Sequence, residues 1–430
     1  MYITGWTALL AALGAVPAVW SSGRTFAWVW VLSVLALAAI DAWLAPRATQ
    51  VGVRRTAPGA VRLTESTQAT LEVANLGRRR MRLTVRDAWQ PSAGADEARH
   101  RLKLAGGESM RLTTGLTPTR RGDRQADRVT VRVAGPLHLA GRQRSIEANG
   151  HLRVLPEFAS RRHLPSRLAR LREIDGQTAV QLKGAGSEFD SLREYVIGDD
   201  VRSIDWRASA RHADVQVRTY RPDRDRRVLT VLDTSRMSAA RVGDSPRLDA
   251  SIEATLLLTA LASRAGDRVQ VTAFDRVERA RAAGTSGPAV MPALADALAT
   301  VEPALIEPDW AAVARLVQGR LSQRALVVLL TTIDVSAIDS GLLDTVRSLS
   351  RSHVVLVASV DDPDEVAMLE GRDDVHAVYS AAAAARARIE RDGVGMRLRQ
   401  MGAEVVHAAP DDLAPAVADR YLALKAAGRL

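Results

Sequence analysis

The chain of 430 residues has no cysteine, few aromatic residues and only three lysines among its 59 basic residues. The absence of cysteine excludes disulfides, iron–sulfur clusters, cysteine zinc sites and thiol nucleophiles, and it agrees with a cytoplasmic environment. Aromatic residues make up 4% of the chain and nowhere alternate with basic residues as in a single-strand binder, so we expect no nucleic-acid partner. With a net charge of +10, binding of nucleic acid or anionic lipid by arginine stays an alternative, and it predicts affinity that falls steeply with salt.

Charge is almost missing from two stretches near the N-terminus. Residues 3–20 are uncharged, and residues 26–45 contain one charged residue, Asp41. Each stretch of about 18–20 residues would form a helix of about 27–30 Å, the thickness of the hydrocarbon core. No basic residue precedes the first stretch, which argues against a signal peptide. The sequence therefore predicts a two-helix transmembrane hairpin over residues 1–48, with a buried helical hairpin as the weaker alternative.

Arginine placement predicts the orientation of this hairpin. The short connection contains Arg24, whereas Arg47, Arg54 and Arg55 closely follow the second stretch. Because basic residues are retained on the cytoplasmic side, we expect both termini and all following domains in the cytoplasm, at the inner (plasma) membrane.

Three further regions follow the hairpin. Residues 49–156 alternate apolar and polar residues in short runs, a pattern typical of a β-sandwich-like domain. Residues 157–227 begin as a basic helical connector, for which contact with anionic headgroups is an alternative to a plain surface helix. Residues 228–430 alternate apolar strand-like runs with helical segments, which predicts a doubly wound α/β domain with a mainly parallel sheet. Its strands are expected at 228–233, 269–274, 325–330, 353–358 and 404–407.

The connector ends in a segment, 184–227, that is dense in paired opposite charges. Clustered carboxylates of this kind could perform acid–base catalysis or bind Mg²⁺, which makes a hydrolase or other enzyme using residues 188–205 the alternative function. Each carboxylate has an arginine nearby, however, which favours an internally neutralised structural network. The residues assigned to this motif are Glu188, Arg193, Glu194, Asp199, Asp200, Arg202, Asp205, Trp206 and Arg211.

The stretch GSEFDSLREYVIGDDVRSIDWRASAR resembles the signature of a bacterial family known as domain of unknown function 58, which is similar to von Willebrand factor A domains. The turns at 119–122 and 135–137 resemble turns of the family's β region, and the two apolar stretches match its membrane anchor. The resemblance implies a von Willebrand A-like fold and a non-enzymatic scaffold. It also implies a partner, a MoxR-type AAA+ ATPase, in the assembly or maturation of protein complexes.

Ligands of doubly wound sheets bind at the carboxyl ends of strands, and the first predicted strand ends at Asp233. Von Willebrand A domains hold Mg²⁺ there, on an Asp-x-Ser-x-Ser motif with a distant Thr and Asp. The resemblance therefore implies a metal site of Asp233, Ser235, Thr285 and Asp334. Met237 occupies the third motif position, and a thioether is a poor Mg²⁺ ligand. The alternative is that Asp233 and Ser235 cap the following loop and helix by hydrogen bonding.

Overall fold

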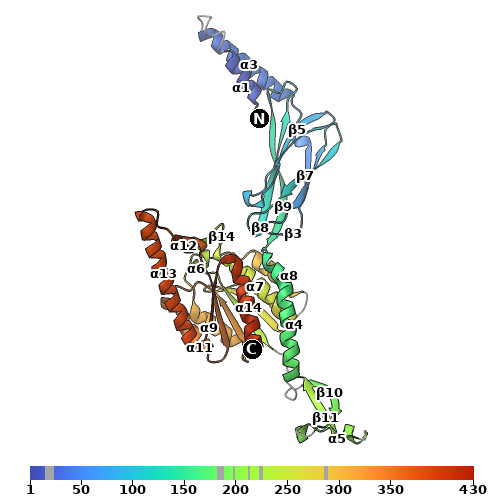
Figure 1. The fold of residues 1–430 in the computed structure, drawn as a ribbon. Coiled ribbons are helices and arrows are strands. Elements are labelled where there is room, and N and C mark those ends of the chain that lie inside the picture. Colours follow the sequence, from blue (N-terminus) through green and yellow to red (C-terminus); the bar gives the residue numbers. More distant parts are fainter. Residues whose placement is uncertain (15–23, 182–187, 197–198, 212–213, 222–225, 285–288) are drawn as a thin grey trace. The chain divides into compact units, whose positions relative to one another are not determined.

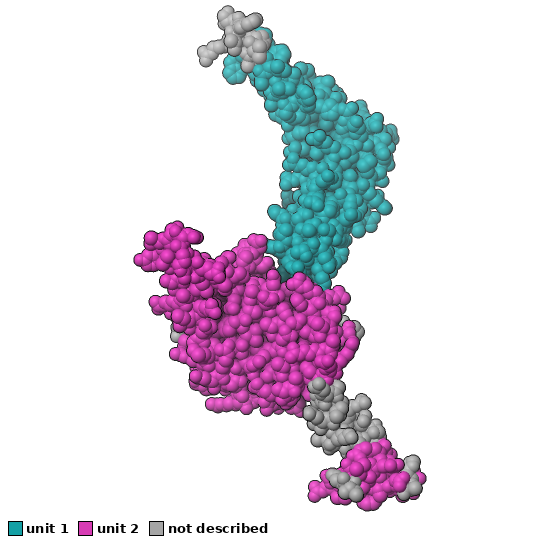
Figure 2. All heavy atoms as spheres, viewed as in Figure 1, with its two compact units in different colours: residues 1–157 teal, residues 158–430 magenta. Residues whose placement is uncertain are grey.

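The computed structural model describes residues 1–14, 24–181, 188–196, 199–211, 214–221, 226–284 and 289–430 (Figure 1). They form two compact units, residues 1–157 and 158–430, which Figure 2 colours separately. Each unit is described by itself below.

The N-terminal unit begins with two apolar helices, α1 (Gly5–Leu13) and α3 (Arg24–Leu44). The 21 residues of α3 extend about 31 Å, enough to cross a hydrocarbon core. Among the described residues, one helical stretch, Thr25–Gln50, is long and apolar enough to span a membrane. Helix α1 has nine residues, and the rest of the first predicted span lies outside the described residues. A membrane-spanning helix over the first apolar stretch, and with it the two-helix hairpin, therefore stays a prediction.

The rest of this unit is β-rich, as the alternating pattern predicts. One sheet has the strand order β1-β9-β8-β5-β6, with β3 beside β9, and a second sheet has the order β2-β4-β7. Inward-facing residues of both sheets, such as Leu71, Val73, Leu83 and Val131, share one core. The strands are β1 (Tyr2–Ile3), β2 (Val51–Thr56), β3 (Ala60–Arg62), β4 (Thr67–Asn75), β5 (Met81–Asp87), β6 (Arg99–Leu104), β7 (Ser109–Leu116), β8 (Gly122–Ala134) and β9 (Ala140–Leu155), with short 3₁₀ turns at Ala48–Gln50 and Pro91–Ala93.

The C-terminal unit is built on a six-stranded sheet of order β16-β15-β12-β17-β18-β19. Five strands are parallel, and the edge strand β16 runs antiparallel to β15. The strands are β12 (Arg227–Asp233), β15 (Arg268–Phe274), β16 (Glu278–Gly284), β17 (Leu326–Leu330), β18 (Val354–Val360) and β19 (Glu404–Ala408). The predicted apolar strands are thus present in this unit, and β16 adds an antiparallel edge that the sequence pattern does not indicate.

Helices cover both faces of this sheet (Figure 1). Alternate strand residues point to opposite faces, so Val228 and Leu232 pack with α4, α7, α8 and α14, whereas Leu229 and Val231 pack with α9, α11 and α13. The helices are α4 (Leu164–Gln181), α6 (Arg236–Ala239), α7 (Arg247–Arg264), α8 (Val290–Ala299), α9 (Trp310–Arg320), α10 (Ser336–Asp339), α11 (Leu342–Leu349), α12 (Pro363–Met368), α13 (Val375–Gln400) and α14 (Pro410–Ala426).

The charged motif forms a small sheet of its own within this unit. Strands β10 (Glu188–Glu194) and β11 (Gln216–Arg221) pair antiparallel, and a 3₁₀ turn (Val201–Ser203) and helix α5 (Trp206–Ser209) lie between them in the chain. Two-residue strands β13 (Arg241–Val242) and β14 (Ser245–Pro246) pair before α7, and a 3₁₀ turn (Ala159–His163) precedes α4.

Candidate functional site

The carboxyl ends of three neighbouring strands, β15, β12 and β17, meet at one edge of the large sheet, which we call the carboxyl edge. Asp233 is the last residue of β12, and its two carboxylate oxygens accept hydrogen bonds from the Ser235 amide (2.8 Å) and the Thr331 hydroxyl (2.6 Å). Asp275 follows β15 and accepts a bond from the Thr234 hydroxyl at 3.0 Å. Asp233, Thr234, Ser235 and Asp275 are all buried. The edge therefore holds two buried carboxylates in a network of hydroxyl groups.

The two carboxylates have opposite pKa shifts. Burial raises the pKa of Asp233, and the hydrogen bonds from Thr331 and Ser235 offset this only in part. Burial also opposes the charge on Asp275, but the bonds from Arg279 and from the amides of Arg276 and Val277 outweigh it and lower the pKa of Asp275. Asp233 is therefore the carboxyl group of this edge that takes up a proton more readily than a free aspartate.

The donor set at this edge fits a divalent cation poorly. Both oxygens of Asp233 already accept hydrogen bonds, and the Ser235 hydroxyl accepts the Met237 amide at 3.4 Å, as the first turn of α6 requires. Asp334 accepts a bond from the Ser336 hydroxyl at 2.6 Å, and that hydroxyl also lies 3.8 Å from the Met237 sulfur. Among the described residues, no three His, Asp or Glu side chains converge as a metal cluster.

The remaining member of the implied metal site, Thr285, lies outside the described residues. Of the four residues in that site, the structure joins Asp233 and Ser235 by a hydrogen bond, and it joins Asp334 to Ser336. The capping interpretation of Asp233 and Ser235 agrees with these contacts. The Mg²⁺ site stays a prediction, and no step of the proposed function depends on it.

The raised pKa of Asp233 predicts a pH dependence of stability. The folded unit binds a proton at Asp233 at a pH where the unfolded chain, with a pKa of about 3.9, remains ionised. As pH falls from the folded pKa towards the unfolded one, wild type should therefore gain stability relative to Asp233→Asn, by up to about 1.4 kcal/mol per pH unit. Hydrogen exchange of β12 amides, corrected for intrinsic rates, measures this difference.

The matched control is Asp373→Asn, because Asp373 is an exposed aspartate of the same unit. This variant measures the effect of removing an exposed carboxyl group, and the pH dependence of Asp233→Asn is compared with it. A difference of opposite sign for Asp233→Asn would mean that the folded state favours the carboxylate, as a bound cation would require.

Sequence reasoning missed Asp275 and Thr234 as members of this edge. The signal was available for Asp275, because it follows the predicted strand 269–274 just as Asp233 ends the strand 228–233. Parallel neighbours end at the same edge, so both carboxylates could have been assigned to it. Thr331 directly follows the predicted strand 325–330, but nothing in its spacing from Asp233 indicates the hydrogen bond between them.

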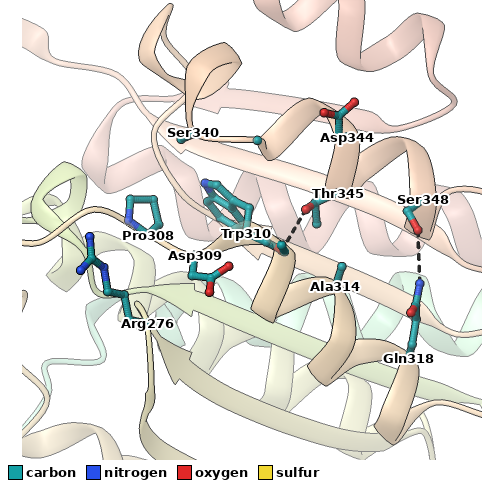
Figure 3. A pocket seen from close by; sticks show the side chains of 12 residues that line it. Arg276, Pro308, Asp309, Trp310, Ala314, Gln318, Ser340, Asp344, Thr345 and Ser348 are labelled. Atoms are coloured by element: carbon teal, nitrogen blue, oxygen red, sulfur yellow. Dashed lines mark hydrogen bonds between the residues drawn. The ribbon is translucent and has the colours of Figure 1, made fainter.

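A polar groove of about 740 Å³ lies between α9 and α11 (Figure 3). Asp309 caps α9 through the Ala312 amide at 2.8 Å, and the Thr345 hydroxyl donates to the Trp310 carbonyl at 2.9 Å. Arg276 lines the groove, and its side chain donates to the Glu307 carbonyl at 3.1 Å. Because Arg276 directly follows Asp275, the groove adjoins the carboxyl edge.

The charged motif is held together by pairs of its own residues. Arg193 donates two bonds to Asp199, at 2.6 and 2.7 Å, and Asp205 caps α5 while accepting the Arg218 guanidinium at 2.8 Å. The Ala208 amide and Arg218 lower the pKa of Asp205, so it remains a carboxylate. The Asp200 side chain accepts the Arg202 amide at 2.9 Å. These contacts support the structural interpretation of the motif over the catalytic one.

The remaining residues assigned to the motif, Glu188, Glu194, Trp206 and Arg211, take no part in the hydrogen bonds just described. Glu194 and Arg211 are exposed, and Trp206 has 69% of its surface exposed. Glu188 begins β10, paired in register with Arg221.

Fold and site together define an α/β domain with a hydroxyl-lined carboxyl edge, in a chain that also has a β-rich unit and an apolar helix. A family model described as "Protein of unknown function DUF58" matches residues 191–403, which include most of the charged motif and most of the large sheet. The resemblance to this family that the sequence predicts is therefore confirmed over these residues.

Two relatives are uncharacterized proteins of Mycobacterium tuberculosis and Mycobacterium bovis, each 25% identical over 204 residues, or 47% of this chain and 63% of the relative. The chain therefore spans less than two thirds of their length. Among solved structures, a PapD-like domain of human CEP192 is 12% identical with a TM-score of 0.20, covering 26% of this chain and 88% of that one. Native Escherichia coli alpha-2-macroglobulin is 15% identical with a TM-score of 0.21, covering 25% and 7%. These likenesses are too weak to support a functional argument.

Proposed function

We propose that the chain is a membrane-anchored interaction protein, facing the cytoplasm, whose C-terminal domain is von Willebrand A-like and docks a MoxR-type AAA+ ATPase. The observation that carries the proposal is helix α3. Large apolar side chains along it, such as Trp28, Leu32 and Ile40, are exposed to 50% or more, and 22% of its apolar window is buried. A soluble surface would not expose an apolar stretch of this length, whereas a hydrocarbon core would cover it.

The order of the large sheet supports the von Willebrand A-like part of the proposal. Its first strand β12 is central, its antiparallel strand β16 is at the edge, and Asp233 ends β12. The ATPase partnership rests on the family resemblance of the motif, and the structure contributes a candidate surface for it. That surface is the carboxyl edge with the adjoining groove of Arg276 and Asp309.

An exposed ion pair marks this surface. Arg236, on α6 directly after the Asp233 loop, contacts Glu307 at 2.7 Å, and both side chains are about half exposed. Arginine is enriched among the residues that dominate binding energy at interfaces. An exposed position also allows charge reversal without removing a buried contact of the fold.

Reversing this charge is expected to weaken ATPase binding. Full-length protein in mild detergent, immobilised and titrated with a purified MoxR-type ATPase from the same genome, should bind at least about tenfold more weakly as Arg236→Glu, about 1.4 kcal/mol. Arg386→Glu is the matched control, because Arg386 is 82% exposed on α13 and pairs with Glu390 in the same way. It should bind as wild type does.

Adding a chelator distinguishes a Mg²⁺ site at the carboxyl edge from the capping role of Asp233 and Ser235. Because Asp233 is hydrogen bonded to Ser235 and Thr331, binding of the nucleotide-free ATPase should be unchanged by a chelator, and its loss would support the Mg²⁺ site. Equal binding by wild type and Arg236→Glu would refute the proposed surface, and no binding at all would refute the ATPase partnership. If the ATPase does not bind, the alternative is a hydrolase or other enzyme that uses residues 188–205. Catalytic turnover by wild type that is lost in a folded Asp200→Asn variant would favour this alternative.

A further inference from the structure

The β-rich unit contains a basic groove on the solvent face of the sheet β9-β8-β5-β6. The cavity has a volume of about 1640 Å³. Glu97 is the single acidic residue among its described lining residues. The basic residues that line it, here called the cation face, are Arg82, Arg86, Arg99, Arg101, Lys103 and Arg132.

Strand register places these cations against one another. Arg82 lies directly opposite Lys103, and Arg86 lies directly opposite Arg99, in the antiparallel pair β5–β6. Like charges at directly opposed positions destabilise a sheet. Two such pairs on one face of the sheet cost stability, and a bound anion would remove that cost.

No acidic side chain neutralises the cation face. Within the described residues, none of its six members forms an ion pair, and all are exposed. Arg82 contacts the His138 ring, and Arg132 donates to the Gln143 amide oxygen at 2.8 Å while lying 5.1 Å from the Tyr2 ring centroid. None of these partners is a carboxylate, so they orient the guanidinium groups and leave their charge available to a ligand.

The groove begins where helix α3 meets the β-rich unit. Tyr2, Thr4, Trp6 and His138 line that end of it. The Thr4 hydroxyl donates to the carbonyl oxygens of His138 (2.7 Å) and Leu139 (3.0 Å), in the same turn that receives α3. Aromatic rings such as those of Tyr2 and Trp6 favour the membrane–water interface. The row of Arg82 and Lys103 is the one nearest this end, and the row of Arg86 and Arg99 lies about 13 Å farther along the strands.

We propose that the cation face binds the phosphate groups of anionic phospholipids in the membrane that α3 spans. This inference rests on the membrane anchoring of the proposed function. The interfacial layer beyond the hydrocarbon core is about 5–8 Å deep, so it reaches the row of Arg82 and Lys103 first. Arg132 lies opposite Thr84, between this row and the row of Arg86 and Arg99. Bound lipid thereby fixes the β-rich unit against the bilayer surface.

Native mass spectrometry of the full chain in uncharged detergent tests this binding with phosphatidylglycerol and, as the neutral lipid, phosphatidylcholine. Wild type should retain phosphatidylglycerol in preference to phosphatidylcholine. Each cation near a membrane surface contributes about fivefold, so the triple variant Arg82→Gln/Lys103→Gln/Arg132→Gln should bind about a hundredfold more weakly. The pair Arg86→Gln/Arg99→Gln should have a smaller effect.

The matched control is Arg111→Gln/Arg128→Gln/Arg144→Gln, three exposed arginines of the same unit that do not line the groove. Circular dichroism of each variant establishes whether it is folded. If the triple variant is not folded, the pair Arg86→Gln/Arg99→Gln provides a second measurement of lipid binding. Equal loss in the control, or equal binding of phosphatidylcholine, would overturn the proposal in favour of nonspecific charge. Displacement of the lipid by millimolar inorganic phosphate would overturn it in favour of a free phosphate ligand.

Extraction of wild-type membranes with alkaline carbonate tests the anchoring separately. Release of the full chain into the soluble fraction would refute anchoring through α3. The lipid selectivity of the cation face would then still be decided by the same titration, so the two failures are distinguishable.

Discussion

Replacing Asp87 with alanine is expected to lower the free energy of unfolding of the β-rich unit by about 3–5 kcal/mol. Asp87 contacts Arg55 in an ion pair whose two side chains are each 1% exposed. The Trp89 indole and the Thr114 hydroxyl also donate to Asp87, at 3.1 and 3.2 Å. Loss of the carboxylate leaves the buried Arg55 charge uncompensated, which costs far more than the pair contributes when intact. Denaturant unfolding, with hydrogen exchange of β5 to assign the transition, measures the loss.

Two comparisons make this prediction specific. Asp123→Ala breaks an ion pair with Arg153 whose side chains are 32% and 28% exposed, so it should cost less than about 1 kcal/mol. The double variant Arg55→Met/Asp87→Leu removes both charges and should recover most of the stability lost in Asp87→Ala. A loss in Asp87→Ala no larger than that in Asp123→Ala would contradict the buried network.

Local periodicity was sufficient to predict the strands that surround this ion pair. Leu71 and Val73 in β4, and Leu83 and Val85 in β5, alternate with polar residues and are buried, as a half-buried strand requires. The apolar runs of β12 and β17 likewise predicted strands of a mainly parallel sheet and placed Asp233 at a strand end. The side chains that bond to Asp87 and Asp233 could not be predicted, because local periodicity says nothing about distant residues. Asp87 and Arg55 are 32 residues apart, and Asp233 and Thr331 are 98 residues apart.

The small sheet β10–β11 shows a second kind of limit. Its strands are mostly polar, and charged pairs such as Arg193–Asp199, six residues apart, and Asp205–Arg218, 13 residues apart, stabilise it in place of an apolar face. Pattern reasoning therefore identified the charges but not the strands. The antiparallel strand β16, Glu278–Gly284, was missed for the related reason that its alternation consists of alanine and arginine rather than large apolar residues.

A charged residue in the apolar helix α3 has an equally long-range explanation. In the sequence, Asp41 is only an interruption near the end of an apolar stretch. In the structure it is fully buried, and its carboxylate accepts hydrogen bonds from the amides of Leu137 (2.7 Å), Leu139 (2.8 Å) and Ala140 (2.9 Å). A negative charge near a helix C-terminus is otherwise unfavourable, so these amides determine its place there. Asp41 thus joins helix α3 to the turn between β8 and β9.

Asp41→Ala is therefore expected to detach α3 from this turn. Each buried amide left without an acceptor costs about 1–3 kcal/mol, so the contact as a whole should weaken by about 3 kcal/mol or more. Hydrogen exchange of residues 137–140 in the full chain should become at least about a hundredfold faster, because exchange follows the free energy of local opening. Asp127→Ala, at an exposed aspartate of β8, is the control and should leave these amides protected.

Gly135→Ala provides an independent route to the same effect. A Cβ atom at Gly135 would lie 2.6 Å from the Asp41 carbonyl oxygen and close to its carboxylate, so the helix and the turn would have to move apart. The alanine keeps every hydrogen-bonding group of wild type, and faster exchange at residues 137–140 would then arise from the lost approach alone. Protection of these amides in both variants would contradict the role of Asp41. Faster exchange in both, with the β5 and β4 amides unchanged, would place the weak point at the junction of helix and β-rich unit rather than in the unit itself.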